Sequence, residues 1–320
     1  MKLKSVSVLK SLAASIISIM AAPAIGQSGA FEINQACVAD GCFPGDEPGF
    51  PVSLAEPGTY ILTSNLTVID PNVLGIDFGA SNIALDLNRF SVSGPVVCTG
   101  EPATCDQSGP AVGVNGGFHE NLRITNGTVS GFSQWGVVTG PNSYIINIVS
   151  RSNFARGIVA REGTQVLNSK ALQNEGAGIS LREDSIARGI IASGNGTGIT
   201  MGCSDESGCN QLISGNVSKN ALGIFDWGGS LIMDTVVSYN LDQGIENRNG
   251  ASSYVNNSVL FNGLTGISVG GGSALSDPAL PVVIRGTTIT GSQSNVIVGS
   301  GGTLIDAGGN VCGFSQSCPD

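Results

Sequence analysis

A glycine followed by isoleucine or valine recurs along most of the chain, and from residue 113 onward the interval is 20 to 25 residues. A period of this length is typical of a solenoid, in which each repeat forms one coil and buries its apolar side chains against its neighbours. Each repeat holds three apolar segments separated by turn-forming residues, which predicts three short strands per coil. The recurring glycines are Gly75, Gly113, Gly136, Gly157, Gly178, Gly198, Gly223, Gly244 and Gly266.

The composition favours strands and tight turns over helices. Glycine contributes 47 of 320 residues, and only 12% of the residues are charged. Asparagine recurs at one turn of each coil, where side-chain amides can hydrogen-bond from coil to coil and support the turn. The sequence therefore predicts an all-β, single-stranded parallel β-helix of about 10–11 rungs of about 21 residues. The asparagines of this column are Asn153, Asn174, Asn195, Asn220, Asn240 and Asn262.

The first residues of the chain have the features of a secretory signal peptide. Lys2, Lys4 and Lys10 form a basic start, an apolar run covers residues 12–22, and small residues follow up to Gly26. The run is shorter than a bilayer span requires. We therefore expect residues 1–26 to be removed, with no membrane span. Residues 27–320 are expected to form one domain, with an irregular N-terminal cap at 31–58 and a C-terminal cap at 303–320. A capped solenoid of this kind is expected to be a monomer in the periplasm or the medium.

Eight cysteines fall into four pairs that are close in sequence, and an even count in an exported chain indicates disulfides. A zinc site is the alternative, but the spacings are loose for a metal and His119 is the single histidine. We predict four short-loop disulfides and no metal site. The expected pairs are Cys37/Cys42, Cys98/Cys105, Cys203/Cys209 and Cys312/Cys318.

The net charge of −10 argues against nucleic-acid binding, because neutralising phosphates requires clustered Lys and Arg. Three insertions lie where a Gly-Ile segment begins or ends, at residues 98–105, 203–209 and 270–281. Solenoids usually carry such insertions around their functional face. The Gly-Ile sheet is therefore the predicted binding face.

Several segments carry a resemblance to a known group of proteins. They read PGTYILTSNLTV at 57–68, SNIALDLNRFSVSG at 81–94 and NGTVSGF at 126–132, followed by the repeated Asn-x-x-x-Gly-Ile. Together they resemble the right-handed parallel β-helix proteins of the pectate-lyase-like superfamily, of exported bacterial type, over nearly all of the mature chain. That group includes pectate lyases, polygalacturonases, alginate lyases and mannuronan epimerases. The resemblance implies a right-handed helix and work on a polysaccharide at the Gly-Ile sheet.

Strand alternation selects the side chains that would face outward on that sheet. With the isoleucines of Gly-Ile inside, the next residue of each strand faces out, and a second outward column follows two residues later. The first column is Val159, Ser180, Thr200, Phe225, Glu246 and Ser268. The second column is Arg161, Arg182, Gly202, Trp227, Arg248 and Gly270.

These columns offer the groups needed to bind and cleave an acidic polysaccharide. Trp227 can stack on a sugar ring with Phe225 beside it, and Arg248 can hold an acid group. An eliminative lyase also needs a carboxylate neutraliser and an acid or base, roles predicted for Arg182, Arg161, Glu246 and Asp226. No cofactor is predicted, although calcium held by outward carboxylates is an alternative neutraliser. The competing interpretation is a solvated face with scattered ion pairs and one exposed aromatic.

The motifs of the known enzymes are missing from this sheet. The chain has ALGIFDWGG and DQGIENRNG where polygalacturonases carry Gly-Asp-Asp and Gly-His-Gly, and the Asp-Pro-His-Asp motif of the epimerases is missing. Two functions therefore stay open. One is a secreted protein that binds an acidic polysaccharide and cleaves it by β-elimination. The other is a non-catalytic adhesin, surface module or glycan-binding protein.

Overall fold

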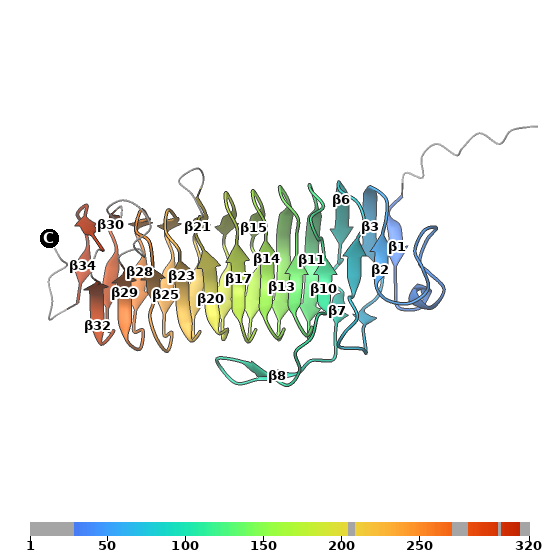
Figure 1. The fold of residues 1–320 in the computed structure, drawn as a ribbon, viewed down its shortest axis with the longest axis horizontal. Coiled ribbons are helices and arrows are strands. Elements are labelled where there is room, and N and C mark those ends of the chain that lie inside the picture. Colours follow the sequence, from blue (N-terminus) through green and yellow to red (C-terminus); the bar gives the residue numbers. More distant parts are fainter. Residues whose placement is uncertain (1–28, 204–208, 271–280, 300–301, 314–320) are drawn as a thin grey trace, which may run out of the picture.

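The computed structural model describes residues 29–203, 209–270, 281–299 and 302–313. They form a right-handed parallel β-helix, with successive coils running along one long axis from the N-terminal end to the C-terminal end (Figure 1). The described residues contain one short helical turn, η1 (Cys37–Ala39). Among them, no helix is long and apolar enough to cross a membrane. The fold predicted from the 21-residue repeat is confirmed.

The Gly-Ile segments form one continuous parallel sheet of 11 strands, here called the front sheet. Each coil contributes one strand to it, and each strand pairs with the strand of the next coil. Its strands are β2 (Val52–Leu54), β5 (Ile76–Phe78), β10 (Val112–Asn115), β12 (Trp135–Val138), β14 (Arg156–Ala160), β17 (Ala177–Leu181), β20 (Thr197–Met201), β23 (Leu222–Asp226), β26 (Ile245–Asn247), β29 (Thr265–Val269) and β32 (Ser294–Val298).

The other two strands of each coil complete the triangular cross-section. They are joined into one sheet because β11 (Arg123–Ser130) and β13 (Tyr144–Arg151) run continuously through both positions. The second strands are β1 (Phe31–Ile33), β3 (Gly58–Leu62), β6 (Ile83–Asp86), β15 (Gln165–Leu167), β18 (Ile186–Arg188), β21 (Gln211–Ile213), β24 (Leu231–Met233), β27 (Ser253–Val255), β30 (Val282–Arg285) and β33 (Leu304–Asp306). The third strands are β4 (Leu66–Thr67), β7 (Ser91–Ser93), β16 (Lys170–Leu172), β19 (Ile191–Ser193), β22 (Asn216–Ser218), β25 (Val236–Ser238), β28 (Ser258–Leu260), β31 (Thr288–Thr290) and β34 (Val311–Cys312).

The isoleucines of the repeat form a stack inside the solenoid. Ile158 pairs in register with Ile179, and Ile179 pairs with Ile199. All three side chains are fully buried in one continuous apolar core. Because equivalent positions lie directly above one another, each coil buries its apolar side chains against the same types in the coils on either side. The predicted interior stack is confirmed.

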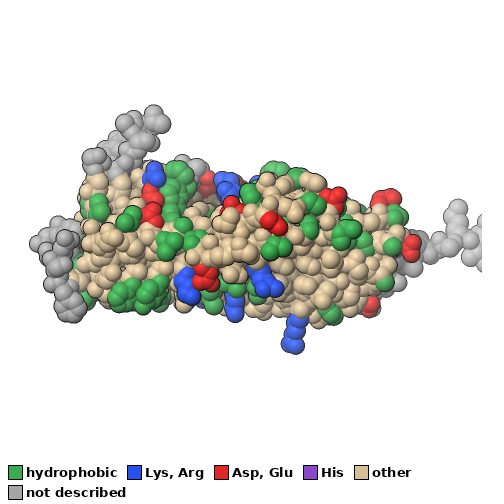
Figure 2. All heavy atoms as spheres, turned by 90° about the horizontal axis from the view of Figure 1, so that it is seen from below, with side chains coloured by type: hydrophobic (Ala, Val, Ile, Leu, Met, Phe, Trp, Pro, Cys, Tyr) green, Lys and Arg blue, Asp and Glu red, His purple; other side chains and the backbone are tan. Residues whose placement is uncertain are grey.

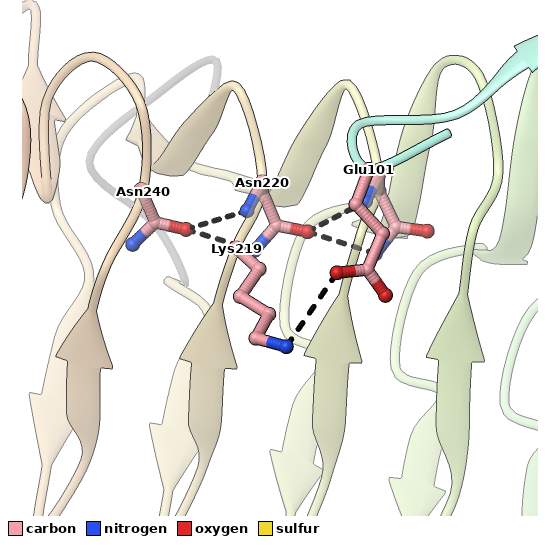
Figure 3. A network of polar contacts seen from close by, with 5 residues as sticks. Glu101, Lys219, Asn220 and Asn240 are labelled. Atoms are coloured by element: carbon pink, nitrogen blue, oxygen red, sulfur yellow. Dashed lines mark hydrogen bonds and ion pairs between the residues drawn. The ribbon is translucent and has the colours of Figure 1, made fainter.

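A second stack is polar and runs along the turn that leads into the front sheet. The Oδ1 atom of Asn220 accepts hydrogen bonds from the backbone N–H and the Nδ2 of Asn195, at 2.9 and 3.0 Å. Asn240 does the same for Asn220, as Figure 3 shows. The same pattern joins all six asparagines from Asn153 to Asn262, and each is at most 2% exposed. The ladder thus provides hydrogen-bond acceptors for backbone N–H groups of these turns, which are buried inside the solenoid.

The two predicted caps contain regular strands as well as irregular chain. In the segment 31–58, β1 pairs with β3 and β2 pairs with β5, so the first coil begins inside the expected N-terminal cap. In the segment 303–320, β33 and β34 pair with β30 and β31. Residues 314–320 of the expected C-terminal cap lie outside the described residues. The predicted signal peptide, residues 1–26, lies outside the described residues.

Three of the predicted disulfides are present, namely Cys37–Cys42, Cys98–Cys105 and Cys203–Cys209. Cys318 of the fourth predicted pair, Cys312/Cys318, lies outside the described residues. The Cys98–Cys105 bridge closes a hairpin of β8 (Cys98–Thr99) and β9 (Thr104–Cys105). This hairpin extends along the lower edge of the solenoid in Figure 1.

The hairpin is fastened to turns of several later coils. The backbone N–H of Cys105 donates to the carboxylate of Glu175, and that of Ala103 donates to the carbonyl of Gly194. At the tip, Lys219 forms an ion pair with Glu101 at 3.5 Å (Figure 3). Figure 2 looks onto this edge of the molecule, where charged side chains are few and scattered. The hairpin therefore braces the turns beside the front sheet.

Candidate functional site

The two predicted outward columns lie on the outer face of the front sheet. Strand register places Val159, Ser180 and Thr200 side by side in the first column. The register continues through Phe225, Glu246 and Ser268. In the second column, the backbone N–H of Arg182 donates to Ala160 and that of Trp227 donates to Met201, so these residues follow the same rung order. The alternation inferred from Gly-Ile is correct.

A groove of about 560 Å³ lies on this face between strands β14 and β26. This volume is in the range of small-molecule binding sites, and the lining combines apolar, aromatic and charged groups as such sites do. Arg182, Phe225 and Trp227, all predicted from the sequence, line it. The described residues that line it are Arg156, Ser180, Leu181, Arg182, Glu183, Thr200, Met201, Gly202, Cys203, Phe225, Trp227 and Asn249.

The floor of the groove is made by small residues. Ser180 and Thr200 are neighbours on β17 and β20, and the Thr200 hydroxyl donates to the Ser180 oxygen at 2.8 Å. Beside them Gly202 has no side chain, and a Cβ there would lie 2.4 Å from the Cβ of Trp227. Gly202 also has a φ of +136°, which only glycine adopts readily. The hollow therefore exists because the second column skips one side chain between Arg182 and Trp227.

One end of the groove is cationic. Burial lowers the pKa of Arg156, and the positive charge of Arg182 lowers it further. Burial also lowers the pKa of Arg161, with a second contribution from Arg182. The two ion pairs found among the described residues involve other arginine or lysine groups. The Glu162 charge acts on Arg161 in the opposite direction and raises its pKa. Three guanidinium groups thus influence one another at this end, an arrangement that an anion would stabilise.

The other end of the groove is an aromatic wall. The rings of Phe225 and Trp227 meet edge to face, with centroids 4.9 Å apart and an angle of 83°. The Arg248 guanidinium lies 5.3 Å from the Phe225 ring and donates from Nε to Glu246 at 2.6 Å. Trp227 remains 51% exposed. An exposed indole beside a polar floor is suited to stacking on an apolar face of a ligand.

Asp226 lies beneath this wall, inside the solenoid, and is fully buried. Its carboxylate accepts hydrogen bonds from the Gly228 N–H, the Ser230 and Ser252 hydroxyls, the Asn247 amide and the Tyr254 hydroxyl, at 2.7 to 3.1 Å. A buried carboxylate is tolerated only with such complete hydrogen bonding. Burial raises the pKa of Tyr254 well above its usual range, and the Asp226 charge raises it further.

Beyond the cationic end, the outer face of the front sheet is filled by apolar side chains. Val112, Val138 and Val159 face outward, yet each is at most 5% exposed, and Trp135 packs against them. Beside this cluster the Arg161 guanidinium lies 4.1 Å from the centre of the Phe118 ring. The Nε atom of Arg161 is buried and has no hydrogen-bond partner among the described residues. The groove therefore ends at these coils.

The structure separates the other predicted site residues from the groove. Arg248 and Glu246 are paired with each other behind the aromatic wall, and Arg161 lies against Phe118 at the cationic end. Asp226 does not reach the outer face, so it cannot serve there as the acid or base predicted from the sequence. The reason is the strict alternation of β23, in which Phe225 faces out and Asp226 faces in.

Several lining residues were missed from the sequence, and Arg156 is the most informative. It precedes its repeat glycine, at the position that Trp135 occupies one coil earlier. Trp135 packs against the outward-facing valines and Arg156 lines the groove, so this position belongs to the outer face. Counting the residue before the glycine as well as those after it would have found Arg156. Ser180 and Thr200 lie in the first predicted column, whereas Leu181, Met201, Glu183 and Asn249 were also missed.

No cluster of three or more His, Cys, Asp or Glu side chains suited to a metal ion occurs among the described residues. His119 lies outside the groove lining, on a turn where its backbone N–H donates to the Gly116 carbonyl. The groups that the groove offers to a ligand are therefore guanidinium groups, hydroxyls, aromatic rings, the Asn249 amide and the carboxylate of Glu183.

Comparison with known protein families and with curated protein sequences finds no match to this chain. Among solved structures, the A-module of the mannuronan C-5 epimerase AlgE6 of Azotobacter vinelandii matches with 17% identity and a TM-score of 0.53, covering 90% of each chain. A double mutant of the periplasmic alginate epimerase AlgG matches with 14% identity and a TM-score of 0.58, covering 88% of this chain and 84% of that one.

The catalytic domain of a GH87 alpha-1,3-glucanase in complex with nigerose matches with 10% identity and a TM-score of 0.52. That match covers 81% of this chain and 55% of the glucanase chain. At identities this low, the likeness concerns the fold and not the site. Its repeat, its strand register and these matches show that the chain has the fold of a right-handed parallel β-helix.

Proposed function

We propose that this protein binds an acidic polysaccharide in the groove of the front sheet and cleaves it by β-elimination. The observation that carries the proposal is the groove itself, where the guanidinium groups of Arg156 and Arg182 and an exposed tryptophan line a hollow with a hydroxyl-bearing floor. Arginine recognises carboxylate and sulfate groups through paired hydrogen bonds, and an aromatic ring stacks on the apolar face of a sugar.

The chemistry of β-elimination assigns roles within this groove. Arg182 and Arg156 neutralise the carboxylate of the bound sugar, which makes its α-proton easier to remove. Glu183, the acidic residue among the described lining residues, is assigned to take that proton and to return it to the glycosidic oxygen as the bond to this leaving group breaks. Trp227 holds the ring in place. Arg161 adds positive charge at the cationic end.

A specific observation favours a second function, non-catalytic glycan binding. Of the predicted acids, Glu246 is held by Arg248 and Asp226 is buried in the interior. An adhesin or glycan-binding module would need the arginines and the tryptophan but no acid or base. In either case we propose an exported monomer, in the periplasm or the medium, since its disulfides require an oxidising compartment.

The experiment that separates the two functions follows the ultraviolet absorbance of the unsaturated sugar product. The purified protein is incubated with polygalacturonate, alginate, ulvan and chondroitin sulfate. A lyase gives rising absorbance that Arg182→Ala abolishes. The matched control is Arg188→Ala, which removes an exposed arginine from β18, on another face of the same coil, and which should leave the rate unchanged.

Calorimetric titration with the same polymers tests the second function, glycan binding without cleavage. Binding without product, lost in Arg182→Ala and kept in Arg188→Ala, would support the glycan-binding module. If none of the four acidic polymers binds the protein, the proposed function is wrong.

A further inference from the structure

The floor of the groove is short along the solenoid axis. Arg182 and Trp227, which bound this floor, directly follow strands β17 and β23, two rungs apart, which corresponds to about 10 Å. Between them lie the small residues Thr200 and Gly202. The hollow is therefore the length of one or two sugar units laid along the axis, and it contains one aromatic platform and one cationic end.

The aromatic wall closes the hollow toward the C-terminal end. Trp227 is held edge to face by Phe225, and Arg248 packs on Phe225 while bound to Glu246. The turn after β23 is also fixed from below, because Asp226 accepts a hydrogen bond from the Gly228 N–H. The Phe225 and Trp227 side chains could therefore move out of the way of a ligand only by breaking these contacts.

The hollow is closed toward the N-terminal end as well. Outward-facing Val138 and Val159 are covered, at 1% and 5% exposure. Phe118 reaches from the coil of β10 to the Arg161 side chain on the coil of β14. Bulky side chains thus stand at both axial ends of a floor made of serine, threonine and glycine.

From this closure we infer that the groove recognises the end of an acidic glycan and not its interior. The inference rests on the proposed function and specifies its substrate. A chain lying along the sheet would have to cross the aromatic wall or the apolar cluster. A terminal sugar can instead enter with its acid group on Arg182 and Arg156 and its ring against Trp227, while the rest of the chain leaves into solvent.

The first test measures how affinity depends on oligosaccharide length. The protein is titrated calorimetrically with galacturonate and alginate oligomers of one to six units. End recognition predicts that affinity levels off by the dimer and changes less than about threefold up to the hexamer. A steady increase that exceeds about threefold between dimer and hexamer would overturn the inference and leave the proposed function intact.

The second test varies the number of chain ends while the total amount of uronate stays constant. Polygalacturonate is hydrolysed to about one tenth of its mean length and compared with the intact polymer at equal total uronate. End recognition predicts that the apparent affinity per uronate unit rises about tenfold, because the number of ends rises tenfold. An unchanged value means interior recognition and overturns the inference. If Arg182→Ala abolishes this binding and Arg188→Ala does not, the binding takes place in the groove. Failure of every acidic probe to bind overturns both the proposed function and the inference.

Discussion

Replacing one asparagine of the ladder should destabilise the whole solenoid by an amount that the hydrogen bonds allow us to estimate. The Asn195 side chain accepts from the N–H and Nδ2 of Asn174 and donates to the Ala171 carbonyl and to Asn220, at 2.9 to 3.0 Å. A protein hydrogen bond contributes about 1 kcal/mol net, so Asn195→Ala should cost roughly 4 kcal/mol. The cost is not offset by water, because Asn195 is fully buried.

Urea denaturation followed by circular dichroism measures this loss as a lowered midpoint. The matched control is Asn216→Ala, which removes an exposed asparagine from β22 on a neighbouring coil and should change stability by less than about 0.5 kcal/mol. Equal midpoints for the two variants would refute the reasoning, because the ladder would then contribute nothing beyond the backbone turns.

The remaining predictions concern the site and its support. A methyl group at position 202 would lie 2.4 Å from the Cβ of Trp227, so Gly202→Ala should displace the tryptophan. The affinity for polygalacturonate, measured by calorimetry, should fall at least about tenfold. Unchanged affinity would contradict the proposed hollow. In a Trp135→Phe background, Trp227 is the single tryptophan, so its fluorescence should be quenched by iodide and protected by bound saccharide. Burial and then the Asp226 charge raise the pKa of Tyr254 above the ordinary 10.0. As the pH rises above about 10, the tyrosine of the unfolded state therefore loses its proton before that of the folded state. The contribution of Tyr254 to the free energy of unfolding is complete below about pH 10 and declines at higher pH. Tyr254→Phe should flatten that alkaline decline in urea midpoints, whereas Tyr239→Phe, on an exposed tyrosine, should not.

Local spacing predicted the features of this protein that repeat. The Gly-Ile period places Ile158 above Ile179 because one coil always uses nearly the same number of residues. The same period identified Arg182, Phe225 and Trp227 as outward-facing and the asparagine column as a ladder. These inferences needed only strand alternation and an equal rise per coil.

Contacts between long side chains could not be predicted in the same way. The sequence places Glu246 and Arg248 two residues apart on one face, but whether they pair with each other or with a ligand depends on rotamers. Arg156 was missed because alternation counted back from Ile158 places it inward, whereas it lines the groove on the outer face. The extent of the groove depends on Phe118, which reaches across coils in a direction that no repeat encodes.

The polar residues inside the solenoid also bear on where its site lies. At the inward position that Asp226 occupies, the two preceding coils carry Leu181 and Met201, the next coil carries the buried Asn247, and the coil after that carries Val269. An apolar residue there would stabilise the interior more than a carboxylate that must be supplied with five hydrogen bonds. Asp226 and Asn247 together interrupt the apolar stack next to Trp227, and Asp226 fixes the turn after the indole by accepting from the Gly228 N–H. Departures from a consistent core are expected where function requires a defined local shape, and this one coincides with the wall that bounds the groove.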